Sequence, residues 1–166
     1  GCEFRSASDT EVLLQAWETW GEECLPRLRG MFAFAMWDSQ ERRLTCVRDA
    51  FGIKPLFYAN LKGGFYFASE LPALHALIGE QMTMNSAGML DYLVHGRYDL
   101  GTETFFQNYE RIAPGHLLRV SLHGGSMNVD TERWWWPTTN QHPGLSFEDA
   151  ASGVKERFLE NIRLHL

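Results

Sequence analysis

The longest uninterrupted apolar run of the chain is Met31-Phe32-Ala33-Phe34-Ala35-Met36-Trp37, which is followed by a polar stretch from Asp38 to Glu41. A second extended segment then runs from Arg43 to Arg48. A strand that is apolar at every position, rather than at alternate positions, is typical of a sheet covered on both faces. We therefore expect the two segments to form a hairpin in the centre of a sheet that lies between other layers.

Short strands and helices are expected in the rest of the first 134 residues. Gly63-Gly64 suits a turn between two strands, and His123-Gly124-Gly125-Ser126 suits a turn between two later ones. The expected strands are 56–61, 64–69, 116–122 and 127–134, and the expected helices are 71–78 and 86–95.

The first helix is expected to begin at Ser8-Asp9-Thr10-Glu11, which has the S-x-x-E form of a capping box. Apolar residues follow it at helical spacings of three and four. Gly21 and Pro26 interrupt this pattern, which predicts one long helix followed by a short second one.

The C-terminal part of the chain contains a linker rich in Pro, Gly and Thr, followed by Ser146-Phe147-Glu148-Asp149, which predicts another capped helix. We assign residues 1–137 to a first domain and 138–146 to the linker. Residues 147–166 are expected to begin a second domain, because this helix has an apolar stripe that little remaining chain could cover.

Composition argues against several classes of function. The 166 residues carry a net charge of −6, which does not favour binding to nucleic acid or to anionic lipid. The apolar run is far shorter than the roughly 18 residues that a membrane span needs. Cys2, Cys24 and Cys46 form neither a CxxC pair nor a zinc-ligand pattern with His, so we expect reduced thiols, no metal site and a cytoplasmic location.

Four separate motifs stand out in the first half of the chain. They are Ser8-Asp9-Thr10-Glu11, Leu28-Arg29-Gly30-Met31-Phe32-Ala33-Phe34-Ala35, Arg48-Asp49-Ala50-Phe51-Gly52-Ile53-Lys54-Pro55-Leu56 and Phe67-Ala68-Ser69-Glu70. Taken alone, the third is typical of a structural turn, since it holds opposite charges, a Gly and a Pro. Together, in order and in spacing, the four motifs resemble the glutamine amidotransferase domain of the asparagine synthetases.

The resemblance continues past these motifs. Pro114-Gly115-His116 and Trp135-Trp136-Pro137 resemble the passage from the glutaminase domain into the synthetase domain of the same family. Amidotransferases that act on purines or amino sugars share the RD-x-x-G-x-x-P turn but lead into different second domains. The second part of the resemblance therefore favours asparagine synthetase.

The resemblance implies an α+β fold of the N-terminal-nucleophile type, a four-layer α/β/β/α sandwich. We expect the sandwich to be incomplete here and to be followed by the first helix of the α/β synthetase domain. In this family an N-terminal Cys attacks the side-chain amide of glutamine, its own α-amino group acts as base, and backbone and Asn donors stabilise the oxyanion. The ammonia then attacks a β-aspartyl-adenylate in the synthetase domain.

The substrates and cofactors also follow from the resemblance. Glutamine and aspartate are the implied substrates of a ligase that forms asparagine, AMP and pyrophosphate. ATP and Mg²⁺ are implied for the full-length enzyme. For the present chain we expect no cofactor. Whether the full-length enzyme forms a homodimer is left open. The acceptor is open too, because β-lactam-forming and peptide-amidating relatives share the architecture.

Site residues carry over from the family only in part. Asp9 matches the acidic residue that receives the α-ammonium group of glutamine, although a carboxylate that complements the helix dipole is the structural alternative. Met31 matches a position that lines the ammonia passage, and core packing explains it equally well. The other matched residues are expected to have a structural role; they are Arg48, Asp49, Gly52, Lys54 and Pro55. For Arg48 or Lys54, a contact with the second domain is the alternative.

No catalytic residue is assigned, because we expect the nucleophilic Cys to lie upstream of Gly1. Cys2 follows Gly1 and has no free α-amine, so we take it as structurally ordinary. Gly124-Gly125-Ser126 is expected to be a hairpin turn and not the glycine-rich ATP loop. Without nucleophile, oxyanion donors and ATP loop, the isolated chain is expected neither to hydrolyse glutamine nor to make asparagine.

Two other classes of function remain as alternatives. Trp134-Trp135-Trp136 could serve a non-catalytic binding module, in which Trp134 and Trp136 would form an aromatic platform because neighbours on a strand face opposite sides. A degenerate amidotransferase-like regulator is the other alternative.

Overall fold

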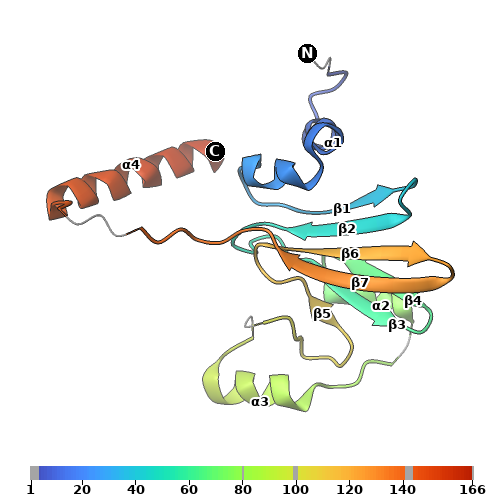
Figure 1. Cartoon of the computed structure of the whole chain (residues 1–166). Coiled ribbons are helices and arrows are strands. Elements are labelled where there is room, and N and C mark those ends of the chain that lie inside the picture. The colour runs from blue at the N-terminus through green and yellow to red at the C-terminus, as the bar shows by residue number, and fades with distance from the viewer. Residues whose placement is uncertain (1–3, 80, 99–100, 141–143, 166) are drawn as a thin grey trace.

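The computed structural model describes residues 4–79, 81–98, 101–140 and 144–165 (Figure 1). The helices are α1 (Asp9–Trp20), the 3-10 helix η1 (Gly21–Arg27), α2 (Leu71–Ile78), α3 (Ser86–His95) and α4 (Phe147–His165). The strands are β1 (Ala33–Asp38), β2 (Arg43–Arg48), β3 (Phe57–Leu61), β4 (Gly64–Ala68), β5 (Glu110–Arg111), β6 (His116–His123) and β7 (Ser126–Arg133).

Two antiparallel sheets are stacked face to face (Figure 1). The first has the order β1-β2-β6-β7, and the second has the order β4-β3-β5. The predicted hairpin forms in register, with Phe34 opposite Val47. Only one strand of the hairpin is central in its sheet. β2 pairs with both β1 and β6, whereas β1 lies at the edge of the sheet in the described part of the chain.

Three separate cores define four layers of structure. Cys46 and Leu118 belong to the core between the two sheets. Their neighbours on β2 and β6, Val47 and Leu117, belong to a second core that packs against α1 and η1. Leu74 of α2 lies in a third core with residues of the second sheet. Because successive side chains point to opposite faces of a strand, the burial of Thr45, Cys46 and Val47 shows that both faces of β2 are covered.

This α/β/β/α arrangement is the predicted fold class. Both predicted middle helices, 71–78 and 86–95, begin and end where the pattern placed them. The late hairpin also forms, and its register pairs His123 with Ser126 across Gly124 and Gly125. The sequence reading missed β5, which is too short to have a pattern of its own and depends on its pairing with β3.

The N-terminal cap of α1 differs in detail from the predicted capping box. The Ser8 side chain caps the helix by accepting the backbone N–H of Thr10 at 3.2 Å. Glu11 reaches further back and accepts the N–H groups of Arg5 and Ser6 at 2.8 and 2.7 Å. The hydroxyl of Ser6 and these backbone contacts hold the pKa of Glu11 below its ordinary value. The cap therefore fixes the segment before α1 as well as the helix itself.

A cluster of charges joins η1 to the first sheet. The Arg119 guanidinium donates to the Glu22 carboxylate through two of its nitrogens and to the Glu132 carboxylate at 2.7 Å. The hydrogen bond from Arg119 holds the pKa of Glu22 below its ordinary value of 4.5. These contacts hold η1 against β6 and β7, which lie far from it in the sequence.

Replacing Glu22 with Gln is expected to lower the free energy of unfolding at pH 7 by about 1 kcal/mol. The loss is small because a partly exposed ion pair contributes little more than this to stability. A lowered pKa in the folded state stabilises the protein above the unfolded-state pKa, and this stabilisation is lost as the pH falls through the folded-state pKa. The difference between wild type and Glu22→Gln should therefore shrink below pH 4.5. Urea unfolding at pH 7 and pH 3 measures it, and a difference that persists at pH 3 would contradict the ionic origin.

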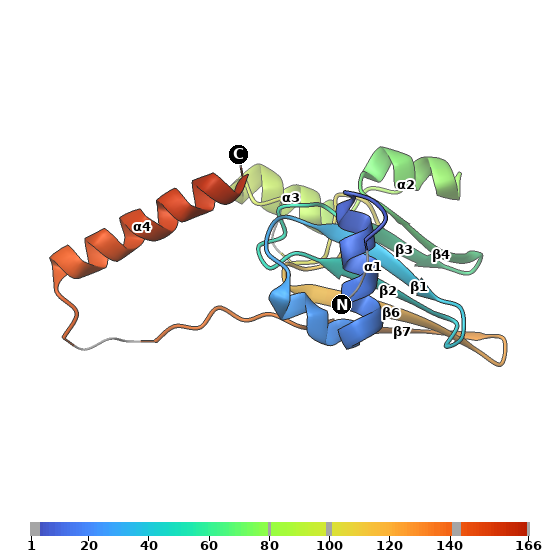
Figure 2. The same cartoon turned by 90° about the horizontal axis from the view of Figure 1, so that it is seen from above.

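Helix α4 is capped as predicted and lies apart from the sheets (Figure 2). The Ser146 hydroxyl accepts the N–H of Asp149 at 3.1 Å and donates to its carboxylate at 2.7 Å. Large apolar side chains of α4, including Phe147 and Phe158, are exposed. Within the described ranges, no helix is both long and apolar enough to cross a membrane.

Candidate functional site

An open cleft of about 880 Å³ lies beside the first sheet, where the quoted motifs meet. The start of α1, the segment before β1, the β2–β3 turn and the end of β4 all contribute to it. The lining residues are Asp9, Thr10, Val12, Leu13, Arg27, Leu28, Arg29, Met31, Phe32, Ala33, Phe34, Lys54, Pro55, Ser69 and Glu70.

Asp9 is the first residue of α1, and its carboxylate is exposed at the cleft. The N-terminus of a helix carries partial positive charge, and an acidic side chain in the first turn complements it. Its one hydrogen bond within the described residues is a long contact of 3.5 Å from the Thr10 hydroxyl. The carboxylate is thus positioned by the helix and has capacity left for a cationic group.

Met31 lies between η1 and β1, at the point where the chain enters the sheet. It lines the same cleft as Asp9 and is partly exposed there. A thioether neither takes up a proton nor binds ammonia strongly, so it suits a surface past which ammonia moves. The two residues for which the sequence predicted a functional role therefore line the same cleft.

The turn between β2 and β3 is held by two buried charged side chains. Arg48 donates to the backbone carbonyls of Lys54, Ile112 and Gly52 at 2.9, 2.7 and 2.6 Å. Asp49 accepts the backbone N–H groups of Phe51, Ile53 and Lys54 at distances from 2.9 to 3.1 Å. These bonds fix the backbone of Lys54, whose side chain lines the cleft.

Gly52 occupies the tightest point of this turn. Its φ is +64°, and a Cβ atom there would lie 2.7 Å from the Pro114 Cγ and 3.0 Å from the Arg48 Cζ. The structure therefore accounts for a Gly at this position through both conformation and space.

We expect Gly52→Ala to lower the free energy of unfolding by about 2–3 kcal/mol, because it combines left-handed strain with a steric clash. Gly124→Ala is the matched control, since φ is +58° at Gly124 and a Cβ atom added there would have nothing within 4 Å. The control should cost about 1 kcal/mol. Equal losses in urea unfolding would show that the contact with Pro114 is unimportant.

Charges of both signs line the cleft. Asp9 and Glu70 provide carboxylates, while Arg29 and Lys54 provide cations. Arg29 and Glu70 belong to two of the motifs, but no role was predicted for either. The four charged residues come from four separate segments of the chain, and no local pattern signals that they line one cleft.

Comparisons with known proteins agree with this geometry. Residues 1–135, which include every cleft residue, match the family of the glutamine amidotransferase domain. The chain belongs to this family.

Two relatives of similar sequence agree with the family assignment. The chain is 31% identical over 166 residues to asparagine synthetase [glutamine-hydrolyzing] 3 of Bacillus subtilis, covering 100% of this chain and 26% of the relative. It is 41% identical over 123 residues to a putative asparagine synthetase of Mycobacterium bovis, covering 72% and 19%. The chain thus spans about a quarter or less of these relatives, and they confirm the predicted resemblance.

The fold is also that of a known amidotransferase. A glutamine phosphoribosylpyrophosphate amidotransferase from B. subtilis superposes with a TM-score of 0.54 and 19% sequence identity, over 82% of this chain and 25% of that one. At this identity the comparison bears on the fold alone, and it confirms the N-terminal-nucleophile type predicted for the amidotransferase domain.

The described cysteines of the amidotransferase domain are poor nucleophiles. Cys24 and Cys46 are both fully buried. Burial raises the pKa of both thiols, that of Cys46 to about 12. Since the thiolate is the reactive form, neither suits the attack on an amide. Cys2, which the sequence reading took as ordinary, lies outside the described residues.

The three consecutive Trp residues have different surroundings. Trp134 packs in the core beneath α1, and its indole N–H donates to the Arg48 carbonyl at 3.2 Å. Trp135 contacts Phe51, and Trp136 is exposed with the Arg133 guanidinium over its ring. Because Trp134 is needed in the core, it cannot form a binding platform together with Trp136.

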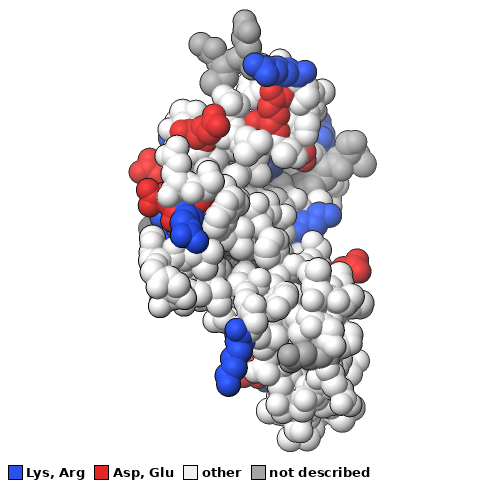
Figure 3. Space-filling view, turned by 90° about the vertical axis from the view of Figure 1, so that its right-hand side faces the viewer, with Lys and Arg blue, Asp and Glu red and all other residues white. Residues whose placement is uncertain are grey.

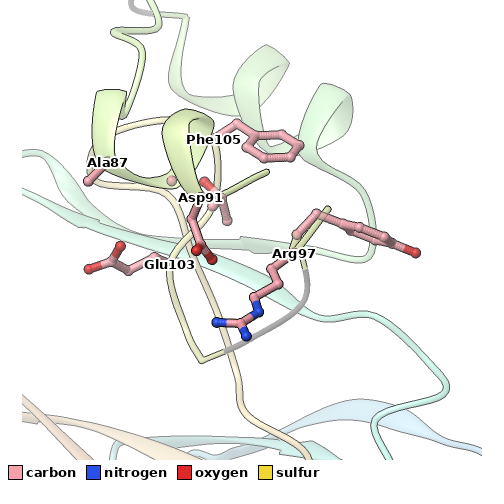
Figure 4. Close-up of a pocket in the computed structure, with 8 residues that line it drawn as sticks. Ala87, Asp91, Arg97, Glu103 and Phe105 are labelled. Carbon is pink, nitrogen blue, oxygen red and sulfur yellow. The ribbon is translucent and has the colours of Figure 1, made fainter. Parts of the chain in front are cut away.

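A second, smaller cavity of about 230 Å³ lies below α3 (Figure 4). Asp91 and Arg97 extend toward one another there. Two of its carboxylates have protein partners, since Asp91 is 4.0 Å from His95 and Glu103 is 3.5 Å from the Asn85 amide. Figure 3 shows that positively and negatively charged side chains lie close together on one face of the molecule. The cavity shares no residue with the Asp9 cleft.

Proposed function

We propose that the chain is part of an asparagine-synthetase-type enzyme that hydrolyses glutamine and uses the ammonia to amidate aspartate. The observation that carries the proposal is the cleft, in which Asp9, Met31 and Lys54 from three distant motifs line one cavity. A lining of both charge signs suits a zwitterionic amino acid. In the proposal Asp9 receives the α-ammonium group of glutamine, and Met31 borders the path of the ammonia.

The reaction in the cleft converts glutamine and water into glutamate and ammonia. Residues of this chain bind and orient the substrate, because the carboxylate at the start of α1 anchors the end of glutamine opposite the scissile amide. We propose that the attacking thiol is neither of the described cysteines, since Cys24 and Cys46 are buried. This anchoring contributes binding energy that holds the amide in place.

The second half of the proposal concerns the other domain. We propose that residues 1–137 belong to the glutaminase domain, 138–146 to a linker and 147–166 to the start of a synthetase domain. We propose that ATP and Mg²⁺ are used there. In the described part of the chain, Gly124 and Gly125 form a hairpin turn.

The test uses the longer protein to which we assign the chain. Purified protein should release glutamate from glutamine and, with aspartate, ATP and Mg²⁺, should form asparagine. Glutamate release without asparagine would restrict the proposal to an amidotransferase with another acceptor. No glutamate release from a protein that carries its N-terminal Cys would overturn it.

A further inference from the structure

Glu11 lies on α1 two residues after Asp9, but its carboxylate bonds to the segment that precedes the helix. It accepts the backbone N–H of Arg5 at 2.8 Å and that of Ser6 at 2.7 Å. The Ser6 hydroxyl also donates to it, at 2.5 Å. Glu11 is not among the described residues that line the cleft. The proposed reaction therefore makes no direct use of its charge.

The contacts of Glu11 differ from those of an ordinary helix cap. A carboxylate at the third position of a helix commonly accepts the backbone N–H of the N-cap residue, which completes a capping box. In this chain the N-cap is Ser8, and its N–H donates to the Ser6 hydroxyl at 3.3 Å instead. Glu11 reaches past the N-cap to residues outside the helix. Its contacts therefore hold the preceding segment against α1, beyond what capping of the helix requires.

A series of hydrogen bonds connects Glu11 to both sides of Asp9. The Ser6 hydroxyl donates to Glu11 and accepts the N–H of Ser8. The Ser8 hydroxyl in turn accepts the N–H of Thr10 at 3.2 Å. Asp9 lies between Ser8 and Thr10 in the sequence, so these contacts set the position of its backbone.

The Asp9 carboxylate has little support of its own. Within the described residues it has one hydrogen bond, the 3.5 Å contact from the Thr10 hydroxyl. Its place at the cleft therefore depends on the backbone of the first turn of α1. An anchoring group contributes most to binding when it is held in place before the substrate arrives, because less conformational entropy is then lost. A side chain that fixes this backbone improves binding without contacting the substrate.

We infer that Glu11 is a positioning residue, which holds Asp9 in place for the α-ammonium group of glutamine. This role rests on the proposed function, because it requires that glutamine binds in the cleft. A carboxylate suits the role better than an amide, because all three of its hydrogen-bond partners are donors. The amide nitrogen of a Gln would face one of these donors, so at least one bond would be lost.

The test compares variants of the full-length protein. Glu11→Gln keeps the size of the side chain and removes its charge, and Ser6→Ala removes the hydroxyl that links Glu11 to Ser8. Glu18→Gln is the matched control, because it removes a carboxylate from the same helix at a side chain that bonds to Gln15. The readouts are the KM and kcat for glutamate release and the preference for glutamine over its analogue without the α-amino group.

Glu11→Gln should raise the KM for glutamine by about tenfold, which corresponds to about 1.4 kcal/mol, and should leave kcat within about twofold of wild type. Its preference for glutamine over the analogue should fall by a similar factor. Ser6→Ala should change both quantities in the same direction by about threefold, and the control should change neither. A merely structural role would lower stability without changing the preference for glutamine.

A double variant tests whether Glu11 acts through Asp9. Once Asp9 is replaced by Asn, no charged anchor is left to position. Adding Glu11→Gln to Asp9→Asn should therefore raise the KM by less than about twofold further. A further rise of about tenfold would mean that the two effects are independent and would overturn the role of Glu11. A Glu11→Gln enzyme with the KM and preference of wild type would overturn it as well.

Two other outcomes are separated by the same set of proteins. If Glu11→Gln does not fold, Ser6→Ala, alone and combined with Asp9→Asn, gives the same comparison with an expected change of about threefold. Wild-type protein that releases no glutamate would overturn the proposed function, and the role of Glu11 with it. Normal release in wild type together with unaffected variants would overturn the role of Glu11 alone.

Discussion

Replacement of Asp49 with Ala is expected to lower the free energy of unfolding by about 3–4 kcal/mol. Its carboxylate is buried and accepts three backbone N–H groups of the turn. Each hydrogen bond to a charged acceptor contributes about 1.5–3 kcal/mol, and the contributions of neighbouring bonds are not additive. Since a domain is stable by only about 5–15 kcal/mol, this loss is a large fraction of the total.

Asp38→Ala provides the matched control for Asp49. Asp38 also accepts two backbone N–H groups, those of Gln40 and Glu41 at 2.9 Å, but it is half-buried at the end of β1, beside an exposed hairpin turn. We expect it to cost about 1 kcal/mol. Equilibrium urea unfolding of both variants measures the difference, and a loss at Asp49 no larger than at Asp38 would show that the buried turn is not a main source of stability.

The second large effect is expected at Asp9. In the full-length enzyme, Asp9→Asn should raise the KM for glutamine by roughly 30- to 150-fold, which corresponds to the about 2–3 kcal/mol of a hydrogen bond to a charged group. The catalytic rate at saturating glutamine should change little, because Asp9 binds the end of the substrate remote from the amide.

Glu18→Gln is the control for this effect. It removes a carboxylate from the same helix, and the Glu18 side chain bonds to Gln15 and lies outside the cleft. The KM for glutamine should stay within about twofold of wild type. Steady-state kinetics of glutamate release measures both variants. An Asp9→Asn enzyme with an unchanged KM would leave Asp9 with the structural alternative, a carboxylate that complements the helix dipole.

The sequence was most informative where local patterns determine structure. The caps at Ser8 and Ser146 and the glycine turn at Gly124 all form where they were predicted. The hairpin of β1 and β2 was predicted correctly from the apolar run 31–37 and the polar turn after it, and in the structure residues 46 and 47 of β2 face two different cores. Edge and centre could not be distinguished, because β1 is the more apolar strand and yet lies at the edge of its sheet in the described part of the chain. The position depends on which strands pair with it.

The candidate site was predictable only in part. Asp9 and Met31 were identified through their motifs, and the structure places both on one cleft. Arg29 and Glu70 were not recognised as members of the site, since a charged residue at the end of a strand or loop is usually solvated. Only the packing of sheets and helices brings these four side chains to one cavity.

The central claim, that Asp9 receives the α-ammonium group of glutamine, is tested most directly with a substrate analogue. The kcat/KM for glutamine and for its analogue without the α-amino group should be measured in the full-length wild type and in Asp9→Asn. We predict that wild type prefers glutamine by roughly 30- to 150-fold and that Asp9→Asn reduces this preference to about threefold or less. A variant that retains the full preference for glutamine would contradict the assignment of Asp9.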